Sequence, residues 1–249
     1  MLAIVGALPE EISLVVASLA DASARVLGRR TFHAGAFHGT PAVAVFSGWG
    51  KVAAAATVTQ LIASFPITQL VFSGVAGAVQ HGLSIGDVVI GTGLLQHDMD
   101  ARPIFPRYEV PLLGKYLFEP DRELREGLVH AAREFLREDL HALVAASELD
   151  FFHVRSPQVT GGVIASGDKF FASTAEVAAL RERLPLVACV EMEGAAVAQV
   201  CEEYGMPFGI VRTLSDSADE SSPHDFPRFA RQVARHYSAG ILARLVREL

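Results

Sequence analysis

The sequence predicts a three-layer α/β/α sandwich, a single domain built around a central mixed, mostly parallel sheet. Three observations support this prediction. The chain of 249 residues is 51% hydrophobic, which is enough to bury the core of one large domain. Its mean hydropathy of +0.33 is high, as expected of a sheet covered on both faces. Short apolar runs also alternate with segments of helical periodicity, which favours parallel strands joined by crossover helices.

Strands are expected where short apolar runs end in glycine or polar residues, and helices where apolar residues recur at helical spacing. The expected strands cover residues 2–6, 41–47, 69–73, 87–91, 188–191 and 208–214. The expected helices cover residues 9–19, 121–138 and 194–204, with two more starting at residues 52 and 226. No linker divides the chain, so we expect one domain over 1–249 with an enlarged variable segment at about 101–159.

Composition argues against several classes of protein. The net charge of −7 gives no basic footprint for nucleic acid. No run of eighteen apolar residues appears, so neither a membrane span nor a membrane partner is expected. Cys189 and Cys201 lack metal-type spacing, and His97, Asp98 and Asp100 have no second cluster to complete a metal site. We therefore expect a cytoplasmic protein without a metal.

Gly48-Trp49-Gly50-Lys51-Val52-Ala53 follows an expected strand and matches the G-x-G-x-x-A dinucleotide pattern. That mechanism also needs an acid about twenty residues later to hold the ribose of NAD. No Asp or Glu lies between Asp21 and Asp87. The sequence thus argues against a nicotinamide cofactor, and the glycines are interpreted as a tight turn close to a small ligand.

Two carboxylates, Glu191 and Glu193, lie where a buried apolar strand turns into a helix. A carboxylate is costly to bury without a partner, and a vicinal ribose diol offers it two hydrogen-bond donors. The alternative is a helix N-terminus that favours acids, which explains Glu193 better than Glu191. The sequence favours the ligand-binding interpretation.

Three further segments follow strands and are candidates for the same site. Residues 74–77, Gly-Val-Ala-Gly, are expected to form a loop that lets a ligand approach the backbone. Asp216 ends the segment 212–216 and is either a general acid or the N-cap of a following turn. Phe170 and Phe171 follow a glycine-rich strand, where they either pack in the core or stack on a base.

The segments Gly6-Ala7 with Glu11, 74–77, Ser-Gly-Asp at 166–168, Val-Glu-Met-Glu-Gly-Ala-Ala at 190–196 and Arg-x-x-Ser-Asp at 212–216 together resemble the nucleoside phosphorylase/nucleosidase superfamily. Within it, they are most similar to the 5′-methylthioadenosine/S-adenosylhomocysteine nucleosidases. The resemblance covers the whole chain and weakens between about residues 101 and 159. It implies a homodimeric enzyme without a cofactor, which hydrolyses the N-glycosidic bond of a purine nucleoside with water.

The resemblance also implies roles for individual residues. Glu11 would position and activate the attacking water, Arg212 would orient that water, and Asp216 would donate a proton to purine N7. This division of roles fits the chemistry of glycoside hydrolysis, in which the leaving group is protonated while water attacks an oxocarbenium-like sugar.

Substrate recognition is implied for a second set of residues. Glu193 would hold the ribose hydroxyls beside Met192, Phe170 would stack on the base, and the Phe171 backbone would read the adenine edge. The remaining expected substrate-binding residues are Leu8, Trp49, Ala76, Gly77, Glu191, Ser215 and Phe226.

The acidic first loop favours hydrolysis over phosphorolysis. Phosphorylases of this superfamily place an arginine there to bind phosphate, whereas this chain has Pro9, Glu10 and Glu11. Val75 replaces a serine that touches the catalytic water in the nucleosidases, so the hydrogen bonding of that water differs from the family pattern.

The segment between residues 97 and 166 is longer than is usual in the family, and Trp49 replaces a small aliphatic wall. Futalosine or aminodeoxyfutalosine hydrolase is therefore an alternative. A purine nucleoside phosphorylase and a non-catalytic purine- or NAD-binding protein are further alternatives. Residues 105–111 are expected to complete the partner subunit's pocket in a dimer.

Overall fold

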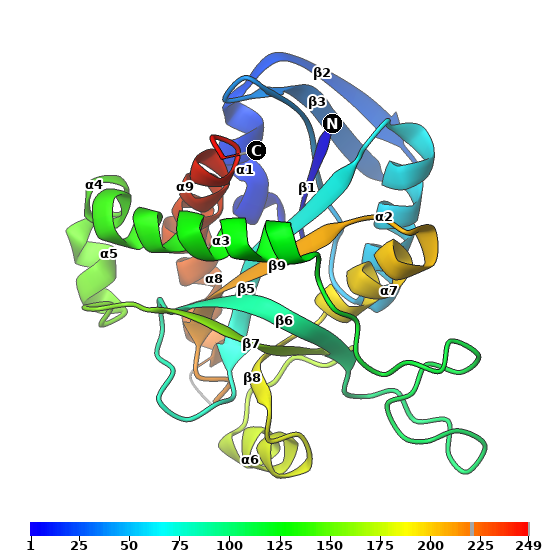
Figure 1. Cartoon of the computed structure of the whole chain (residues 1–249). Coiled ribbons are helices and arrows are strands. Elements are labelled where there is room, and N and C mark those ends of the chain that lie inside the picture. The colour runs from blue at the N-terminus through cyan, green and yellow to red at the C-terminus, as the bar shows by residue number, and fades with distance from the viewer. Residues whose placement is uncertain (220–221, 249) are drawn as a thin grey trace.

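The computed structural model describes residues 1–219 and 222–248 and confirms the predicted fold class, with a mixed sheet between helices on both sides (Figure 1). The strand order is β2-β3-β4-β1-β5-β8-β7-β6-β9. The strands are β1 (Leu2–Gly6), β2 (Leu19–Leu27), β3 (Arg30–Phe37), β4 (Thr40–Phe46), β5 (Gln69–Ala78), β6 (Val88–Gln96), β7 (Val159–Ser166), β8 (Val187–Glu191) and β9 (Phe208–Asp216).

Strand β5 organises the sheet because it pairs with three other strands. It runs parallel to β1 and β9 and antiparallel to β8. The β5–β9 pairing closes β5, β8, β7, β6 and β9 into a ring. Within this ring Gly77 is in register with both Val190 of β8 and Asp216 of β9. The ends of the two acid-bearing strands therefore meet beside β5.

Helices cover both faces of the sheet. A core cluster on one face includes Val15, Leu128, Phe229 and Tyr237, and a cluster on the other includes Val58. The first face carries α1 (Pro9–Ala17), α3 (Arg122–Glu134), α8 (Ser222–Phe229) and α9 (Arg235–Leu245), and the second carries α2 (Lys51–Ser64) and α7 (Gly194–Tyr204). The remaining helices are η1 (Phe135–Asp139), α4 (Leu140–Leu143), α5 (Ala146–Phe151), α6 (Thr174–Arg183) and η2 (Ala230–Ala234). None of the helices described is long and apolar enough to cross a membrane.

Each expected strand and helix has a counterpart in the structure, and most differences concern their ends. The helix expected over 9–19 ends at Ala17, because Leu19 begins β2. The hairpin of β2 and β3 was not predicted, since the side chains of β2 are mostly exposed and show no apolar alternation. The helix expected from residue 226 begins at Ser222 and continues through η2 into α9.

The prediction of a loop at 74–77 is wrong, because these residues continue β5. The glycines serve close packing here instead of a turn. A Cβ atom on Gly74 would lie 2.7 Å from Oε1 of Glu11, and one on Gly77 would lie 2.8 Å from the Cβ of Ala218. At residues 48–50 a turn is present as predicted, since both glycines have positive φ values of 80° and 89°.

Candidate active site

A pocket of about 550 Å³ lies at the ends of β1, β5, β8 and β9. All the predicted site residues except Arg212 line it: Leu8, Glu11, Trp49, Ala76, Gly77, Phe170, Phe171, Glu191, Met192, Glu193, Ser215, Asp216 and Phe226. Five further residues line the pocket and were not among the predicted site residues: Ala7, Val75, Lys169, Val190 and Ala218. Each of these five lies within two positions of a predicted residue, so proximity in sequence was the signal that could have found them.

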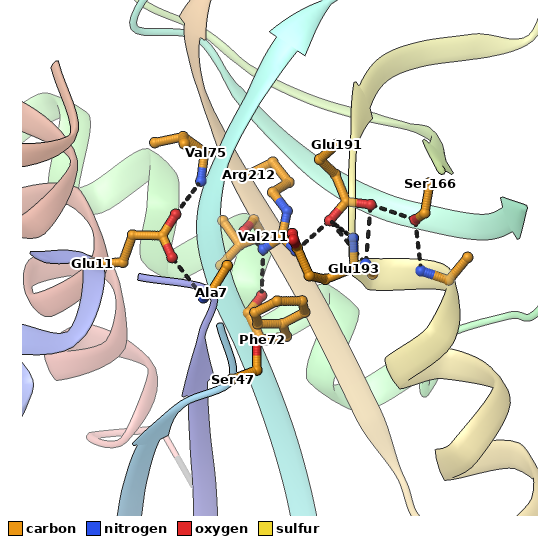
Figure 2. Close-up of polar contacts among 12 residues, drawn as sticks. Ala7, Glu11, Ser47, Phe72, Val75, Ser166, Glu191, Glu193, Val211 and Arg212 are labelled. Carbon is orange, nitrogen blue, oxygen red and sulfur yellow. Dashed lines mark hydrogen bonds and ion pairs between the residues drawn. The ribbon is translucent and has the colours of Figure 1, made fainter. Parts of the chain in front are cut away.

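Glu11 is buried in the first turn of α1 and is held at both carboxylate oxygens (Figure 2). Its Oε2 accepts hydrogen bonds from the backbone N–H groups of Ala7 and Leu8, at 2.7 and 2.9 Å, and its Oε1 accepts one from Val75 at 3.0 Å. Burial raises the pKa of Glu11, while Arg212 and the three N–H groups oppose the rise. The side chain is therefore a fixed carboxyl of increased basicity.

Arg212 lies behind the pocket, 1% exposed, and does not reach its wall. Its Nη2 donates to Oε2 of Glu191 at 2.7 Å, and its guanidinium stacks 4.0 Å from the centre of the Phe72 ring (Figure 2). Because Gly74 has no side chain, Arg212 and Glu11 approach the same point on β5. The geometry suits Arg212 to an electrostatic influence on Glu11.

Glu191 is saturated with internal hydrogen bonds, although it lines the pocket. Its carboxylate accepts bonds from Ser166 Oγ, from the backbone N–H groups of Glu193 and Gly194, and from Arg212. It thereby caps the N-terminus of α7. The expectation that the helix N-terminus explains Glu193 better than Glu191 is wrong, because Glu191 is the side chain that satisfies it.

Glu193 is the N-cap residue of α7, yet its side chain turns away from the helix. Its Oε1 accepts a hydrogen bond from the backbone N–H of Gly50 at 2.7 Å, which joins the pocket to the turn before α2. Burial, reinforced by the nearby Glu191, raises the pKa of Glu193 to about 8. It has fewer internal partners than Glu191 and is the carboxyl more available to a ligand.

Asp216 ends β9 on the opposite side of β5 from Glu11 and is held by short hydrogen bonds. Its Oδ2 accepts from Ser215 Oγ at 2.7 Å, and its Oδ1 accepts from Ser222 Oγ at 2.7 Å and from Ala218 N at 2.8 Å. Ser222 belongs to α8. The orientation of Asp216 therefore depends on where that helix lies.

Aromatic side chains form the outer part of the pocket. The ring of Phe226 on α8 makes edge contacts with Trp49 and Phe170, with centroids 5.8 and 5.7 Å away. Phe171 is buried against His97. Phe170 thus offers a partly exposed ring for stacking, as expected of a base-binding residue, while the Phe171 side chain belongs to the core.

A second groove of about 800 Å³ continues outward from the pocket. It shares four lining residues with the pocket: Leu8, Trp49, Phe170 and Phe226. Two charged residues, Glu10 and Arg231, also line this outer groove. A ligand in the pocket can therefore extend past the aromatic residues toward one acidic and one basic side chain.

Replacing Glu193 with glutamine is expected to stabilise the fold at neutral and alkaline pH. Because the folded-state pKa of about 8 is raised from 4.5, the stabilising contribution of this carboxyl is complete below about pH 4.5 and is lost as pH rises through about 8. Glutamine does not titrate, so the variant's advantage in free energy of unfolding should grow over this range to a few kcal/mol at most. Urea titrations at about pH 5, 7 and 9 measure the difference, and a difference independent of pH would contradict the prediction.

Comparison with known proteins supports the family predicted from the sequence. Residues 1–247 match the family model described as Phosphorylase superfamily. The chain is 34% identical to the 5′-methylthioadenosine/S-adenosylhomocysteine nucleosidase of Anoxybacillus flavithermus, over 100% of this chain and 98% of the relative. It is 36% identical to that of Chromohalobacter salexigens, over 100% of this chain and 97% of the relative.

Solved structures agree with this assignment. The nucleosidase of Neisseria meningitidis, in complex with methylthio-immucillin-A, is 34% identical, with a TM-score of 0.87 and coverage of 100% of this chain and 99% of the other. Futalosine hydrolase of Helicobacter pylori is 32% identical, with a TM-score of 0.82 and coverage of 100% and 97%. By full-length sequence and by fold, the chain belongs to the phosphorylase superfamily.

Proposed function

We propose that this protein hydrolyses the N-glycosidic bond of 5′-methylthioadenosine and S-adenosylhomocysteine, releasing adenine and the thioribose. The observation that carries the proposal is the set of buried carboxyls in one pocket, with Glu11 in the first turn of α1, Glu193 at the N-cap of α7 and Asp216 at the end of β9. Cleavage of this bond needs a base for water, a support for the sugar and an acid for the leaving purine. The similar nucleosidases named above support the choice of substrate.

Glu11 is the proposed general base. Its raised pKa increases its affinity for the proton of an attacking water, and its three N–H donors fix the carboxylate before reaction. Arg212 opposes that rise and keeps the carboxylate form accessible. Val75 offers its backbone N–H to Glu11 but has no side-chain hydroxyl, so the water depends on Glu11 for its orientation.

Asp216 is the proposed general acid toward purine N7. Ser215, Ser222 and Ala218 donate to its two oxygens and fix its orientation. Phe170 stacks on the base in this arrangement, and the buried Phe171 holds its own backbone against the adenine edge. A fixed acid and a stacked base together place the proton close to the leaving nitrogen.

Glu193 is the proposed ribose ligand, with Met192 beside it in the pocket wall. One of its oxygens is bonded to Gly50 N–H, so the other is available to the sugar hydroxyls. The outer groove receives the 5′-substituent, and its acidic Glu10 and basic Arg231 complement the amino-acid group of S-adenosylhomocysteine.

Futalosine hydrolysis is the second candidate. It is favoured by the similarity to the futalosine hydrolase of Helicobacter pylori. The outer groove also has aromatic walls of Trp49, Phe170 and Phe226 that suit a bulkier 5′-substituent. Relative kcat/KM values for methylthioadenosine, S-adenosylhomocysteine and futalosine distinguish the two candidates directly.

Adenine release from methylthioadenosine is expected to be independent of phosphate, because Glu10 and Glu11 lie in the first turn of α1, directly after β1, and repel an anion. Chromatography of the products in phosphate-free and phosphate-containing buffers should show equal adenine and free methylthioribose in both. Formation of a sugar 1-phosphate, or a requirement for added phosphate, would instead identify a phosphorylase.

The Asp216→Asn substitution is expected to lower kcat by about 10²- to 10⁴-fold, the usual contribution of a general acid. The amide keeps the shape of the side chain and can still donate to N7, so nucleoside binding should change little. Stopped-assay kinetics and equilibrium binding of methylthioadenosine measure the two effects separately. A variant with nearly normal turnover would show that Asp216 has only a structural role.

We further propose that the protein is a cytoplasmic homodimer acting in methionine salvage. The segment between β6 and α3 projects from the body (Figure 1) and exposes Ile104, Leu112 and Tyr116, which are 81%, 93% and 58% exposed. Two-fold dimers are the commonest way to cover such a surface. Residues 105–111 belong to this segment, which is why they are proposed to reach the partner subunit's pocket.

Sedimentation velocity should therefore find a dimer, and a Leu112→Asp variant should shift the population toward monomers with reduced activity. The charge is expected to act at the interface because Leu112 contributes nothing to the core of its own subunit. A fully active monomer would contradict the proposed assembly.

A further inference from the structure

Helix α8 contributes to the pocket in two ways. Phe226 lines the pocket and contacts Trp49 and Phe170, and Ser222 donates a hydrogen bond to Asp216. Helix α8 is the first eight described residues of a continuous helical run that passes through η2 into α9. Its Pro227 removes one helical hydrogen bond, and the π-helical segment η2 separates it from α9. Side-chain contacts with neighbouring elements therefore help to fix the position of α8.

One set of these contacts comes from α5. Nε and Nη2 of Arg228 donate to the two carboxylate oxygens of Glu148, both at 2.9 Å, and the guanidinium lies 3.5 Å from the centre of the Phe151 ring. One residue further along each helix, Phe152 makes an edge contact with Phe229 at 5.1 Å. We call Glu148, Phe151 and Arg228 the α5–α8 clamp.

Further contacts fix the position of α5, which carries Glu148 and Phe151 of the clamp. Helix α4 lies beside α9 and α5 lies beside η2 (Figure 1), and Arg244 of α9 bonds to Glu134, Glu138 and Asp139 just before α4. Leu149 and Phe152 are buried in the same core cluster as Phe229. The variable segment at about 101–159 therefore includes a short helix anchored to the body and bonded to α8.

We propose that Arg228 and Glu148 are positioning residues, which hold α8 against the pocket so that Phe226 closes its outer wall and Ser222 orients Asp216. A bidentate arginine–carboxylate pair is directional, and the aromatic face adds to it. Neither side chain lines the pocket. Arg228 and Glu148 therefore affect substrate binding indirectly, by fixing the position of α8. Because Glu148 belongs to the variable segment at about 101–159, a change in that segment alters the site.

Fluorescence tests this proposal without reference to activity. Trp49 is the one tryptophan of the chain, and Phe226 packs edge-on against it. If the clamp is broken by Arg228→Gln or Glu148→Gln, α8 should loosen and acrylamide should quench Trp49 more strongly. The quenching constant should rise by up to about twofold, because Trp49 is already 52% exposed. The double variant Arg228→Glu with Glu148→Arg should restore much of the original value.

Kinetics provide the second readout, which rests on the proposed function. Each single variant should raise KM for methylthioadenosine about three- to tenfold, with a smaller fall in kcat, and the charge-swapped double variant should recover. Arg122→Gln is the matched control, since it breaks an exposed arginine–glutamate pair on α3 that does not contact α8. It should change neither readout.

Two results would overturn the proposal. One is an unchanged quenching constant in both single variants when their thermal unfolding shows that they are folded. The other is an increase that the charge swap fails to reverse, which would indicate general destabilisation and not a specific pair. If the protein proved inactive on methylthioadenosine, the proposed function would fail while the fluorescence comparison still decided the role of the clamp.

Discussion

The site depends on one buried guanidinium placed among three buried carboxyls. Arg212 interacts with Glu11, Glu191 and Glu193, and all four side chains are buried. Glu191 takes the direct ion pair. For Glu11 and Glu193, burial has the dominant effect and raises the pKa of each carboxyl. The positive charge of Arg212 thus stabilises the fold through its ion pair with Glu191. It leaves Glu11 and Glu193 with raised pKa values, which suit the proposed proton transfer and sugar binding.

Glu191 and Glu193 show how two identical side chains, two residues apart, acquire different tasks. Glu191 is the last residue of β8 and points back to the helix N-terminus, Ser166 and Arg212. Glu193 precedes α7 and points across to the turn at Gly50. The difference comes from the exact point at which strand gives way to helix, which sets the direction of each side chain.

Much of the fold could be predicted because strand and helix periodicities are local. Acids and glycines that follow buried runs at 190–194 and 212–216 pointed to Glu191, Glu193 and Asp216, whereas the roles of Glu11 and Arg212 came from the resemblance to the family. The features that could not be predicted depend on contacts between residues that are far apart in the sequence. Nothing in residues 74–77 reveals that β5 continues there between β8 and β9, since glycines mark turns and close packing alike. The exposed strand β2 has no apolar pattern to identify it. Arg212 resembles a pocket residue in sequence and lies behind the wall.

The ring of strands also has a consequence for biosynthesis. Strand β5 is made early in synthesis, but its partners β8 and β9, and the helix α8 that orients Asp216, are made near the end. An incomplete chain on the ribosome can pair β1 with β4 and β5, yet it holds Glu11 without the arginine and the acid that complete the site. Contacts so distant in sequence form late in folding. The site is therefore completed late in synthesis, after the last third of the chain has been made and β8 and β9 pair with β5.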